Sequence, residues 1–501
     1  MEPFQPMTLD ALYRVLTVVH FLSLGFLALY GLHRVVMMLA WVHGRNKERA
    51  AMAGDYAESG QPFVTVQLPL FNESLVAARL INAAAAFAWP RDRLEIQILD
   101  DSTDRTKDIV AERTLFWTAR GVSMSRIGRS DRRGYKAGAL ANGLKQCRGE
   151  FVAVFDADFV PRPDFLQRLM PYFTDPNVGM VQARWSFLNT TNSWLTRLQA
   201  LLLSAHFGVE HRVRHARGLF FNFNGTAGIW RKNAIVTAGG WQPDTVTEDL
   251  DLSYRAQMAG WRFEYVDDVT VPSELPLTLA DFRSQQERWI KGSVQTAKKL
   301  LPRLLASHAP LKIKLEAMAH LLANFCWPAG FIAALTLYPV LCTRVGIGIY
   351  QMVWIDFPLF LLTGIAVMLY YFLYGLKTGQ TSALAALPIL PAVSIGLAPF
   401  FSLAVLKGMF LKGGMFKRTP KFGVLDKDPV WHPVVQVNPQ TLFCLLANIP
   451  LCLYTLSPVF FAWQRGTWPA VPFLLFFPFG FFMVALLDLR ALCAGFVRLR
   501  T

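Results

Sequence analysis

The sequence FVAVFDAD, residues 151–158, places two aspartates directly behind a short apolar run. A run of this length that is rich in Val and Phe predicts a buried β-strand over 151–155. Asp156 and Asp158 then follow at the carboxyl end of the strand. Because open α/β sheets bind their ligands beyond the carboxyl ends of their strands, this stretch predicts both a fold and the place of a site.

The segments around this stretch alternate short apolar runs with longer helical patterns. The runs at 63–68 and 94–99 predict two more strands, and residues 73–86 predict a helix between them. The second of these runs leads into Asp100 and Asp101. The alternation indicates an α/β domain with a largely parallel sheet. Two acidic clusters at two strand ends therefore point into one crevice.

The composition indicates a membrane protein with a separate water-soluble domain. Hydrophobic residues make up 53% of the 501-residue chain and charged residues only 17%, below the roughly 25% of an average soluble protein. Uncharged runs near or above the roughly 18–20 residues of a spanning helix occur at 15–33, 317–343, 357–376, 378–406, 429–464 and 466–487. Between Arg34 and Lys312 there is no such run, so we expect that part to be soluble.

The charges around the first hydrophobic run set the expected orientation. Glu2 and Asp10 precede the run, and Arg45, Lys47 and Arg49 follow it, so the positive-inside rule places the soluble domain in the cytosol. No small-residue cleavage site follows, and we expect the run to remain as an anchor. The net charge of +15 fits contact between basic juxtamembrane segments and anionic membrane lipid. Nucleic-acid binding is not expected, because no basic stripe carries aromatic platforms.

The acidic clusters at the strand ends allow a functional and a structural interpretation. Asp156 and Asp158 can hold Mg²⁺ or Mn²⁺ against a nucleotide diphosphate, although an Asp-x-Asp arises by chance about once in a chain of this length. Asp100 and Asp101 can accept hydrogen bonds from a base or ribose, or form a turn before the next helix. Lys136 stands in a glycine-flanked turn, where it either opens an ordinary helix or reaches a phosphate.

Two further strings carry charged residues in helical segments. Thr247-Glu248-Asp249 opens a helix, and its carboxylates either complement the helix macrodipole or supply a general base that takes the proton of an acceptor hydroxyl. Gln285-Gln286-Glu287-Arg288-Trp289 lies in an amphipathic stretch over 279–305, which we expect at the membrane interface. Arg288 and Trp289 can act there as membrane anchors, or bind a departing diphosphate and a sugar ring.

The order of these motifs resembles the processive members of glycosyltransferase family 2, whose series is D, DxD, TED and QxxRW. The likeness is close from about Phe63 to Trp289. Within that family the chain is most similar to the cellulose-synthase-like mannan and glucomannan synthases of plants and their bacterial relatives. The strings that carry this are LDDSTD (99–104), FNGTAGIWR (223–231), TEDLDL (247–252) and QQERW (285–289).

The resemblance implies an α/β GT-A (nucleotide-diphospho-sugar transferase) catalytic domain plus an α-helical transmembrane region, a Mg²⁺ or Mn²⁺ requirement and inverting transfer. It implies Asp249 as the catalytic base, with Glu248 as the second candidate, and Asp158 and Asp156 as metal ligands. The residues that it implies for donor binding are Asp100, Asp101, Lys136, Asp156 and Arg288. Acceptor binding falls to Asn224, Gly225, Thr226, Trp289 and Gln285.

We expect four parts along the chain. They are an N-terminal transmembrane anchor at 1–45, a cytosolic GT-A catalytic domain at 60–277, interfacial helices with the QxxRW motif at 278–311, and a C-terminal transmembrane region at 312–501 with a cytosolic interfacial segment near 407–435. Five spans after the catalytic domain would leave the basic residues 407–421 outside, against the positive-inside rule. The proline-interrupted run at 378–406 is therefore our candidate for a re-entrant or interfacial piece. This gives one span before the catalytic domain and four after it.

The expected function is processive, inverting synthesis and export of a β-linked polysaccharide, with GDP-mannose giving β-1,4-mannan or glucomannan as the first choice. A β-glucan synthase using UDP-glucose and a non-processive transferase acting on a lipid carrier are the alternatives. A transporter is disfavoured, because transport sites need ionisable groups within the spans and the uncharged runs offer none. We expect an integral protein of a bacterial inner membrane, or of the Golgi membrane in a eukaryote, that contacts lipid and the growing polysaccharide. The oligomeric state stays open.

Overall fold

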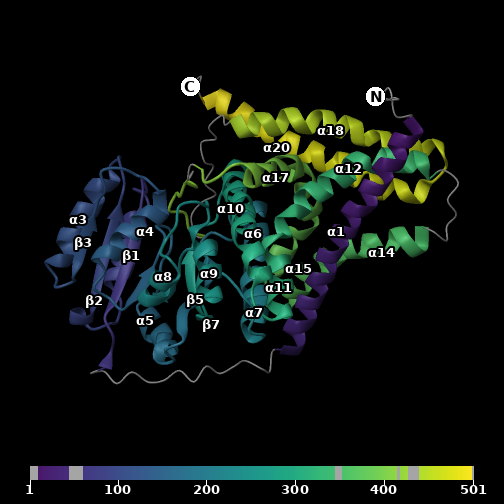
Figure 1. Ribbon diagram of the computed structural model, residues 1–501. Coiled ribbons are helices and arrows are strands. Elements are labelled where there is room, and N and C mark those ends of the chain that lie inside the picture. The colour runs from purple at the N-terminus through teal and green to yellow at the C-terminus, as the bar shows by residue number, and fades with distance from the viewer. Residues whose placement is uncertain (1–8, 45–59, 345–351, 415–417, 427–438, 499–501) are drawn as a thin grey trace, which may run out of the picture. The chain divides into compact units, whose positions relative to one another are not determined.

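The computed structural model describes residues 9–44, 60–344, 352–414, 418–426 and 439–498. The chain forms two compact units. The sheet unit comprises Leu39–Leu321 and Gly408–Trp431, and the helical unit comprises Met1–Met38, Leu322–Lys407 and His432–Thr501. Figure 1 labels many of the elements of both units.

The sheet unit is built on a seven-stranded sheet with the order β3-β2-β1-β4-β6-β5-β7. The strands are β1 (Val64–Leu70), β2 (Leu94–Asp100), β3 (Met124–Ile127), β4 (Phe151–Val154), β5 (Val178–Phe187), β6 (Gly228–Arg231) and β7 (Arg262–Ser273). Strands β1 to β4 pair in parallel, β5 and β7 are parallel to each other, and β6 runs antiparallel to β4 and β5. The predicted α/β domain with a largely parallel sheet is confirmed, and the three predicted strands are β1, β2 and β4.

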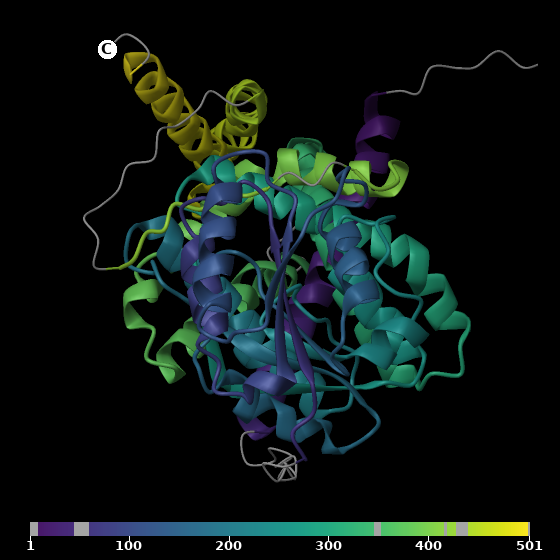
Figure 2. The same cartoon turned by 90° about the vertical axis from the view of Figure 1, so that its left-hand side faces the viewer.

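Helices cover both faces of this sheet (Figure 2). Between the strands lie α2 (Ala77–Ala85), α3 (Thr106–Thr118), α4 (Tyr135–Gln146), α5 (Phe165–Leu169), α6 (Trp194–Ala205), the π-helical turn η4 (His206–His211), α7 (Arg212–Ala216), α8 (Lys232–Thr237) and α9 (Glu248–Met258). After the sheet come α10 (Leu279–Ala306) and α11 (Leu311–Leu321). A helix was predicted over 279–305, and α10 covers this stretch.

The helix expected over 73–86 begins later than predicted. Asn72 has a left-handed backbone with a φ of 54°, and α2 starts only at Ala77. The carbonyl oxygen of Glu73 accepts from the N–H groups of Val76 and Ala77 at 3.1 and 3.0 Å. These bonds form a turn before the helix, so Glu73 lies in the loop after β1.

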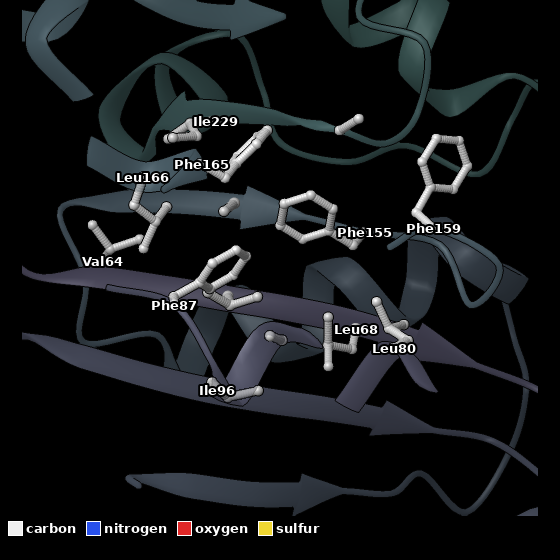
Figure 3. Close-up of a cluster of buried hydrophobic side chains, with 14 of the residues drawn as sticks. Val64, Leu68, Leu80, Phe87, Ile96, Phe155, Phe159, Phe165, Leu166 and Ile229 are labelled. Atoms are coloured by element: carbon white, nitrogen blue, oxygen red, sulfur yellow. The ribbon is translucent and has the colours of Figure 1, made fainter. Parts of the chain in front are cut away.

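Alternating side chains of the central strands divide the core into two layers. One layer, shown in Figure 3, lies between the sheet and the helices α2 and α5. In it the ring of Phe155 lies 4.9 Å from that of Phe165 and 5.7 Å from that of Phe87, measured between centroids. Burial of such a ring stabilises the fold by roughly 1.5–3 kcal/mol. Phe155 therefore anchors the loop that carries the next residue, Asp156.

Within the described residues, six helices are long and apolar enough to cross a membrane, as an integral membrane protein requires. They are Leu9–Gly44, Ala323–Thr343, Trp354–Lys377, Thr381–Phe410, Pro439–Gln464 and Trp468–Cys493. The regular α-helices in these segments are α1 (Leu9–Gly44), α12 (Cys326–Thr343), α14 (Phe357–Phe360), α15 (Ala366–Lys377), α16 (Thr381–Leu384), α17 (Leu390–Phe410), α18 (Pro439–Gln464), α19 (Val471–Leu474) and α20 (Phe476–Arg498).

The run at 378–406 differs from the other apolar segments. It comprises α16 and α17, joined through a 3₁₀ turn at Leu387–Ile389. Its most apolar window is 61% buried, against 17–33% for the other five. Its re-entrant course stays a prediction, as does the cytosolic orientation of the sheet unit. Arg45, Lys47 and Arg49 lie outside the described residues, as do 415–417 and 427–435 of the expected interfacial segment.

Candidate active site

The acidic clusters predicted at the strand ends lie at one edge of the sheet. Strand β1 lies between β2 and β4 and is parallel to both, so the loops after β2 and β4 leave the same edge of the sheet, one on each side of β1. Asp101, Asp156 and Asp158 line one cavity there. The cavity therefore lies where the sequence predicts a ligand site, beyond the carboxyl ends of these strands.

Asp100 and Asp101 have different surroundings. Asp100 is buried, lies 2.8 Å from Nη2 of Arg126 and accepts from the N–H of Ser102 at 3.0 Å. It is not among the residues that line the cavity. Asp101 does line it, and accepts from Nε of Arg129 at 3.0 Å. Of the two aspartates expected at the donor, the structure brings only Asp101 to the cavity.

Strained backbone surrounds the cavity. Three non-glycine residues of the described chain have left-handed φ angles, and each directly precedes or follows a residue of the expected site or the cavity wall. They are Asn72 beside Glu73, Tyr135 beside Lys136, and Ala227 beside Thr226, with φ of 54°, 49° and 57°. For Tyr135 and Ala227 this backbone costs roughly 1–2 kcal/mol, whereas asparagine adopts it more readily. Such strain persists where the surrounding structure enforces it, and it clusters at functional sites.

Lys136 links the Asp-x-Asp motif to the loop at 224–226. Its Nζ lies 2.5 Å from Oδ1 of Asp156 and donates to the carbonyl oxygen of Gly225 at 2.9 Å. Burial alone would lower the pKa of Lys136, but the charges of Asp156, Glu248 and Asp249 raise it above its ordinary value. The cavity therefore contains a permanent cation beside the first aspartate of the motif.

The carboxylates of Glu248 and Asp249, at the start of α9, also line the cavity. Burial raises the pKa of both, that of Glu248 to about 7 with Asp249 as the next cause. Oδ1 of Asp249 accepts from the N–H of Leu250 at 2.8 Å. Oδ2 lies against the loop at 224–226, because a Cβ built on Gly225 would be 2.8 Å from it. A raised pKa suits a general base that works near neutral pH.

The members of the 224–226 loop take different positions. Asn224 and Gly225 line the cavity, whereas Thr226 does not. Thr226 is fully buried, and its hydroxyl accepts from the N–H of Asp156 at 2.9 Å. Thr226 thus supports the loop that carries Asp156, and the structure does not bring it to the expected acceptor position.

Helix α10 supplies Gln285, Arg288 and Trp289 to the cavity wall. Its first turn is capped by Thr278, whose hydroxyl accepts from the N–H of Asp281 at 3.0 Å. Further along, α10 approaches the start of α9 closely, since a Cβ on Gly292 would lie 2.4 Å from Cγ2 of Thr247. Close packing at this glycine therefore sets the position of the two carboxylates relative to α10.

Glu73, Glu274, Arg418 and Lys421 also line the cavity, and sequence reasoning missed all four. Lys421 lies 2.8 Å from Oδ2 of Asp158. Glu274 holds the same segment, since its carboxylate accepts from the N–H groups of Phe422 and Gly423 at 2.7 and 2.8 Å.

Arg418 lies 3.4 Å from Oε1 of Glu73. Burial raises the pKa of Glu73 to about 8, although Arg418 opposes the shift. Glu73 follows the carboxyl end of β1, so the strand-end argument could have found it. Glu274 follows the carboxyl end of β7, so the same argument applies to it, whereas Arg418 and Lys421 had no signal in the sequence.

The aspartates after β4 fit a hard divalent cation that arrives with a nucleotide. The described residues contain no group of three or more His, Cys, Asp or Glu side chains that could hold a metal ion by themselves. Mg²⁺ and Mn²⁺ typically need only one or two carboxylates when phosphate oxygens and water complete the shell. The two lysines at Asp156 and Asp158 show that these carboxylates attract positive charge.

Two family models match the chain over this region. The model described as glycosyl transferase family 2 matches residues 65–236, and the one described as glycosyl transferase family group 2 matches residues 151–390. The chain belongs to glycosyltransferase family 2. The family resemblance, the GT-A-like fold class and the enzyme class expected from the motifs are confirmed.

Curated relatives within the family are mannosyltransferases by name. "Glucomannan 4-beta-mannosyltransferase 2" of Arabidopsis thaliana is 42% identical over 60% of this chain and 58% of its own length. "Probable glucomannan 4-beta-mannosyltransferase 7" of Oryza sativa subsp. japonica is 46% identical over 50% of this chain and 44% of its own length. The chain thus spans about half the length of the curated relatives it matches.

A solved structure supports the fold. The mannosyltransferase PcManGT from Pyrobaculum calidifontis, in complex with GDP-Man and Mn²⁺, superposes with a TM-score of 0.51 at 22% identity, covering 76% of this chain and 98% of its own. At that identity the likeness concerns the fold alone.

Proposed function

We propose that this glycosyltransferase is inverting and processive, and that it adds mannose from GDP-mannose to a β-1,4-linked mannan or glucomannan. The observation that carries the proposal is the position of Asp249. Its Oδ2 lies beside Gly225 and close to the ion pair of Lys136 with Asp156. A donor bound at the aspartates and an acceptor bound at the loop would therefore meet at a carboxylate of the cavity wall.

In this reaction an acceptor hydroxyl attacks the anomeric carbon of the donor mannose from the face opposite the diphosphate. Asp249 takes the hydroxyl proton while the new bond from oxygen to carbon forms. The bond from the anomeric carbon to the diphosphate oxygen breaks, and GDP leaves with the electron pair. Attack opposite the leaving group inverts the anomeric configuration. Lys136 and Arg288 stabilise the negative charge that develops on the diphosphate.

Asp156 and Asp158 are the residues that would hold the cation. Mg²⁺ or Mn²⁺, when bound there, neutralises part of the charge of the diphosphate. We expect Asp158→Ala to fold but to lose Mn²⁺ binding in the presence of GDP, measured by electron paramagnetic resonance. Full activity of the wild-type protein in excess EDTA would remove the metal from the proposal.

The identity of the sugar rests on the relatives. The Arabidopsis and rice proteins at 42–46% identity are named as glucomannan 4-β-mannosyltransferases, and they support mannose as the transferred sugar and a β-1,4-linked acceptor. The six apolar helices support a membrane-bound enzyme. We infer that the active site faces the cytosol, of a bacterium or at a Golgi membrane, and that the polymer leaves through the membrane region.

The test is the incorporation of label from GDP-mannose and, separately, from UDP-glucose by the purified protein in detergent. We expect a polymer from GDP-mannose that β-1,4-mannanase digests and cellulase does not. Incorporation from UDP-glucose alone would refute the donor assignment, and transfer of a single sugar to a lipid carrier would refute processivity.

Two variants test the assigned roles. Asp249→Asn keeps the shape but takes no proton, so transfer should fall by about 10²–10⁴-fold with GDP affinity retained. Asp244→Asn is the matched control, since Asp244 is exposed and lies outside the cavity wall. Trp289→Ala should shorten the product while donor hydrolysis continues, because it removes a surface for sugar stacking. Transfer near the wild-type rate by Asp249→Asn would eliminate this base and turn attention to Glu248.

A further inference from the structure

A buried histidine lies directly behind the 224–226 loop. His211, the last residue of η4, is fully buried. Its Nε2 lies 2.6 Å from Oδ1 of Asn224 and 3.1 Å from the carbonyl oxygen of Asn222. Because a backbone carbonyl can only accept a hydrogen bond, Nε2 carries the proton. That proton in turn requires the oxygen, and not the nitrogen, of the Asn224 amide to face His211.

The imidazole of His211 is neutral and its tautomer is defined. Burial above all lowers the pKa of His211 well below its ordinary value, and the charge of the nearby Arg214 guanidinium adds to the shift. Its Nδ1 has no hydrogen-bond partner among the described residues. An unprotonated ring nitrogen in that position leaves no N–H group unsatisfied, whereas a protonated one would leave a buried donor without an acceptor.

A second histidine faces the other end of the same amide. Nε2 of His206 lies 3.5 Å from Nδ2 of Asn224, a long contact, and its Nδ1 lies 3.3 Å from Oε2 of Glu210. With the proton on Nδ1 donated to Glu210, the lone pair on Nε2 faces the amide nitrogen. The main-chain N–H of Asn224 also donates to Oε1 of Gln182 at 3.0 Å.

Buried charge fixes the turn that carries both histidines. Arg214, whose side chain is 2% exposed, lies 3.2 Å from Glu210 and 2.8 Å from Glu316 of α11. Breaking one pair in such a buried group of charges is strongly destabilising. The ion pairs therefore hold the turn in one arrangement. Single π-helical turns occur frequently at functional sites. This one aims two imidazoles at one residue of the cavity wall.

We propose that His211 is a positioning residue for the acceptor: it holds the Asn224 oxygen so that the amide presents an N–H group to an acceptor hydroxyl in the cavity. This inference rests on the proposed function, in which the 224–226 loop contacts the acceptor. A hydroxyl that gives its proton to Asp249 can only accept from its other neighbours. An amide nitrogen suits that hydroxyl, and a flipped amide would offer it an oxygen.

The experiment compares the partition of donor between transfer and hydrolysis. His211→Phe keeps an aromatic ring and removes the N–H, whereas His211→Gln restores an N–H group. We expect His211→Phe to raise the acceptor KM and the ratio of hydrolysis to transfer by roughly fivefold, the effect of one lost hydrogen bond, with GDP affinity unchanged. His211→Gln should return both values toward those of the wild type.

A matched control separates this role from a structural one. His215 lies on α7, and its Nε2 contacts Oε2 of Glu264 at 2.6 Å, outside the cavity wall. His215→Phe should lower the melting temperature without changing the partition. Asn224→Asp still accepts a hydrogen bond from His211 but offers no side-chain N–H, so it should shift the ratio of hydrolysis to transfer as His211→Phe does. This variant keeps the test available if His211→Phe does not fold.

Two results would overturn the proposal. One is a wild-type ratio of hydrolysis to transfer in His211→Phe or in Asn224→Asp. The other is a rise of this ratio in His211→Gln that is as large as in His211→Phe. A wild-type protein that uses UDP-glucose refutes only the donor assignment, and the variants are then compared with that donor.

Discussion

Gly225 occupies a position where any side chain would clash with the carboxylate of Asp249, which we assign as the base. A Cβ there would lie 2.8 Å from Oδ2 of Asp249 and 3.3 Å from Nζ of Lys136. Ordinary contacts of a Cβ begin at 3.4 Å, so in Gly225→Ala the carboxylate must move by about 0.6 Å. A misplacement of about 1 Å can cost roughly 10²-fold in rate. We expect turnover to fall by about 10–100-fold.

The same substitution also strains the backbone, and the control must separate the two effects. Gly225 has a φ of 82°, and Gly121, in the turn after α3, has a φ of 79° with nothing within 4 Å of an added Cβ. Both alanine variants should lose roughly 1–2 kcal/mol of stability from the left-handed backbone. Only Gly225→Ala should lose turnover.

The assay measures initial rates of transfer from the proposed donor GDP-mannose, GDP affinity and melting temperature for both variants. GDP should bind both variants with nearly the wild-type affinity, because the closest contact of the added Cβ is with Asp249 and its contact with Nζ of Lys136 is longer. Turnover of Gly225→Ala equal to that of Gly121→Ala would refute the placement of Asp249 at the reacting hydroxyl.

Three further outcomes are expected. Lys421→Met should tighten Mn²⁺ binding by about tenfold in electron paramagnetic resonance titrations without nucleotide, since a charged hydrogen bond to Asp158 no longer competes; weaker binding would contradict this. Burial raises the pKa of Asp249, the assigned base, above its ordinary value, and that of its neighbour Glu248 to about 7. Because the base must be deprotonated, initial rates should rise with pH from the ordinary carboxyl range up to neutral pH, and a rate that falls as the pH rises through that range would exclude the assignment. Arg214→Met removes the arginine that two buried glutamates share and should lower the free energy of unfolding by about 3–5 kcal/mol, as measured by denaturant titration; an unchanged midpoint would show that the buried arginine is dispensable.

The part of the site that follows from local pattern was predictable. Short apolar runs predicted β1, β2 and β4, and the parallel order of these strands brought Asp101, Asp156 and Asp158 to one edge. Asp100 does not line the cavity, and the alternating direction of side chains along a strand explains this. Asp100 is the last residue of β2 and its side chain is buried, whereas the next residue lines the cavity. Sequence reasoning treated the two aspartates as equivalent because it did not assign a face to each.

The part that depends on distant contacts was not predictable. Lys421 meets Asp158 across 263 positions of sequence, and no periodicity encodes such a pair. Thr226 was placed at the acceptor by resemblance, whereas its hydroxyl accepts from a backbone N–H beneath the motif. The contact of Lys421 and the hydrogen bond of Thr226 both depend on the direction of a single side chain. That direction is set by the packing of the whole unit.

The two lysines neutralise the motif in different ways, and this difference gives the cavity its chemistry. Lys136 donates to the carbonyl of Gly225 as well as to Asp156, so its charge is built into the loop beside the base. Lys421 reaches Asp158 from the segment at 418–426, which Glu274 holds through backbone N–H groups. Buried carboxylates need a partner of opposite charge. A divalent cation held by Asp156 and Asp158 would take over the charge that Lys421 supplies to Asp158, while Lys136 would keep its hydrogen bond to the carbonyl oxygen of Gly225.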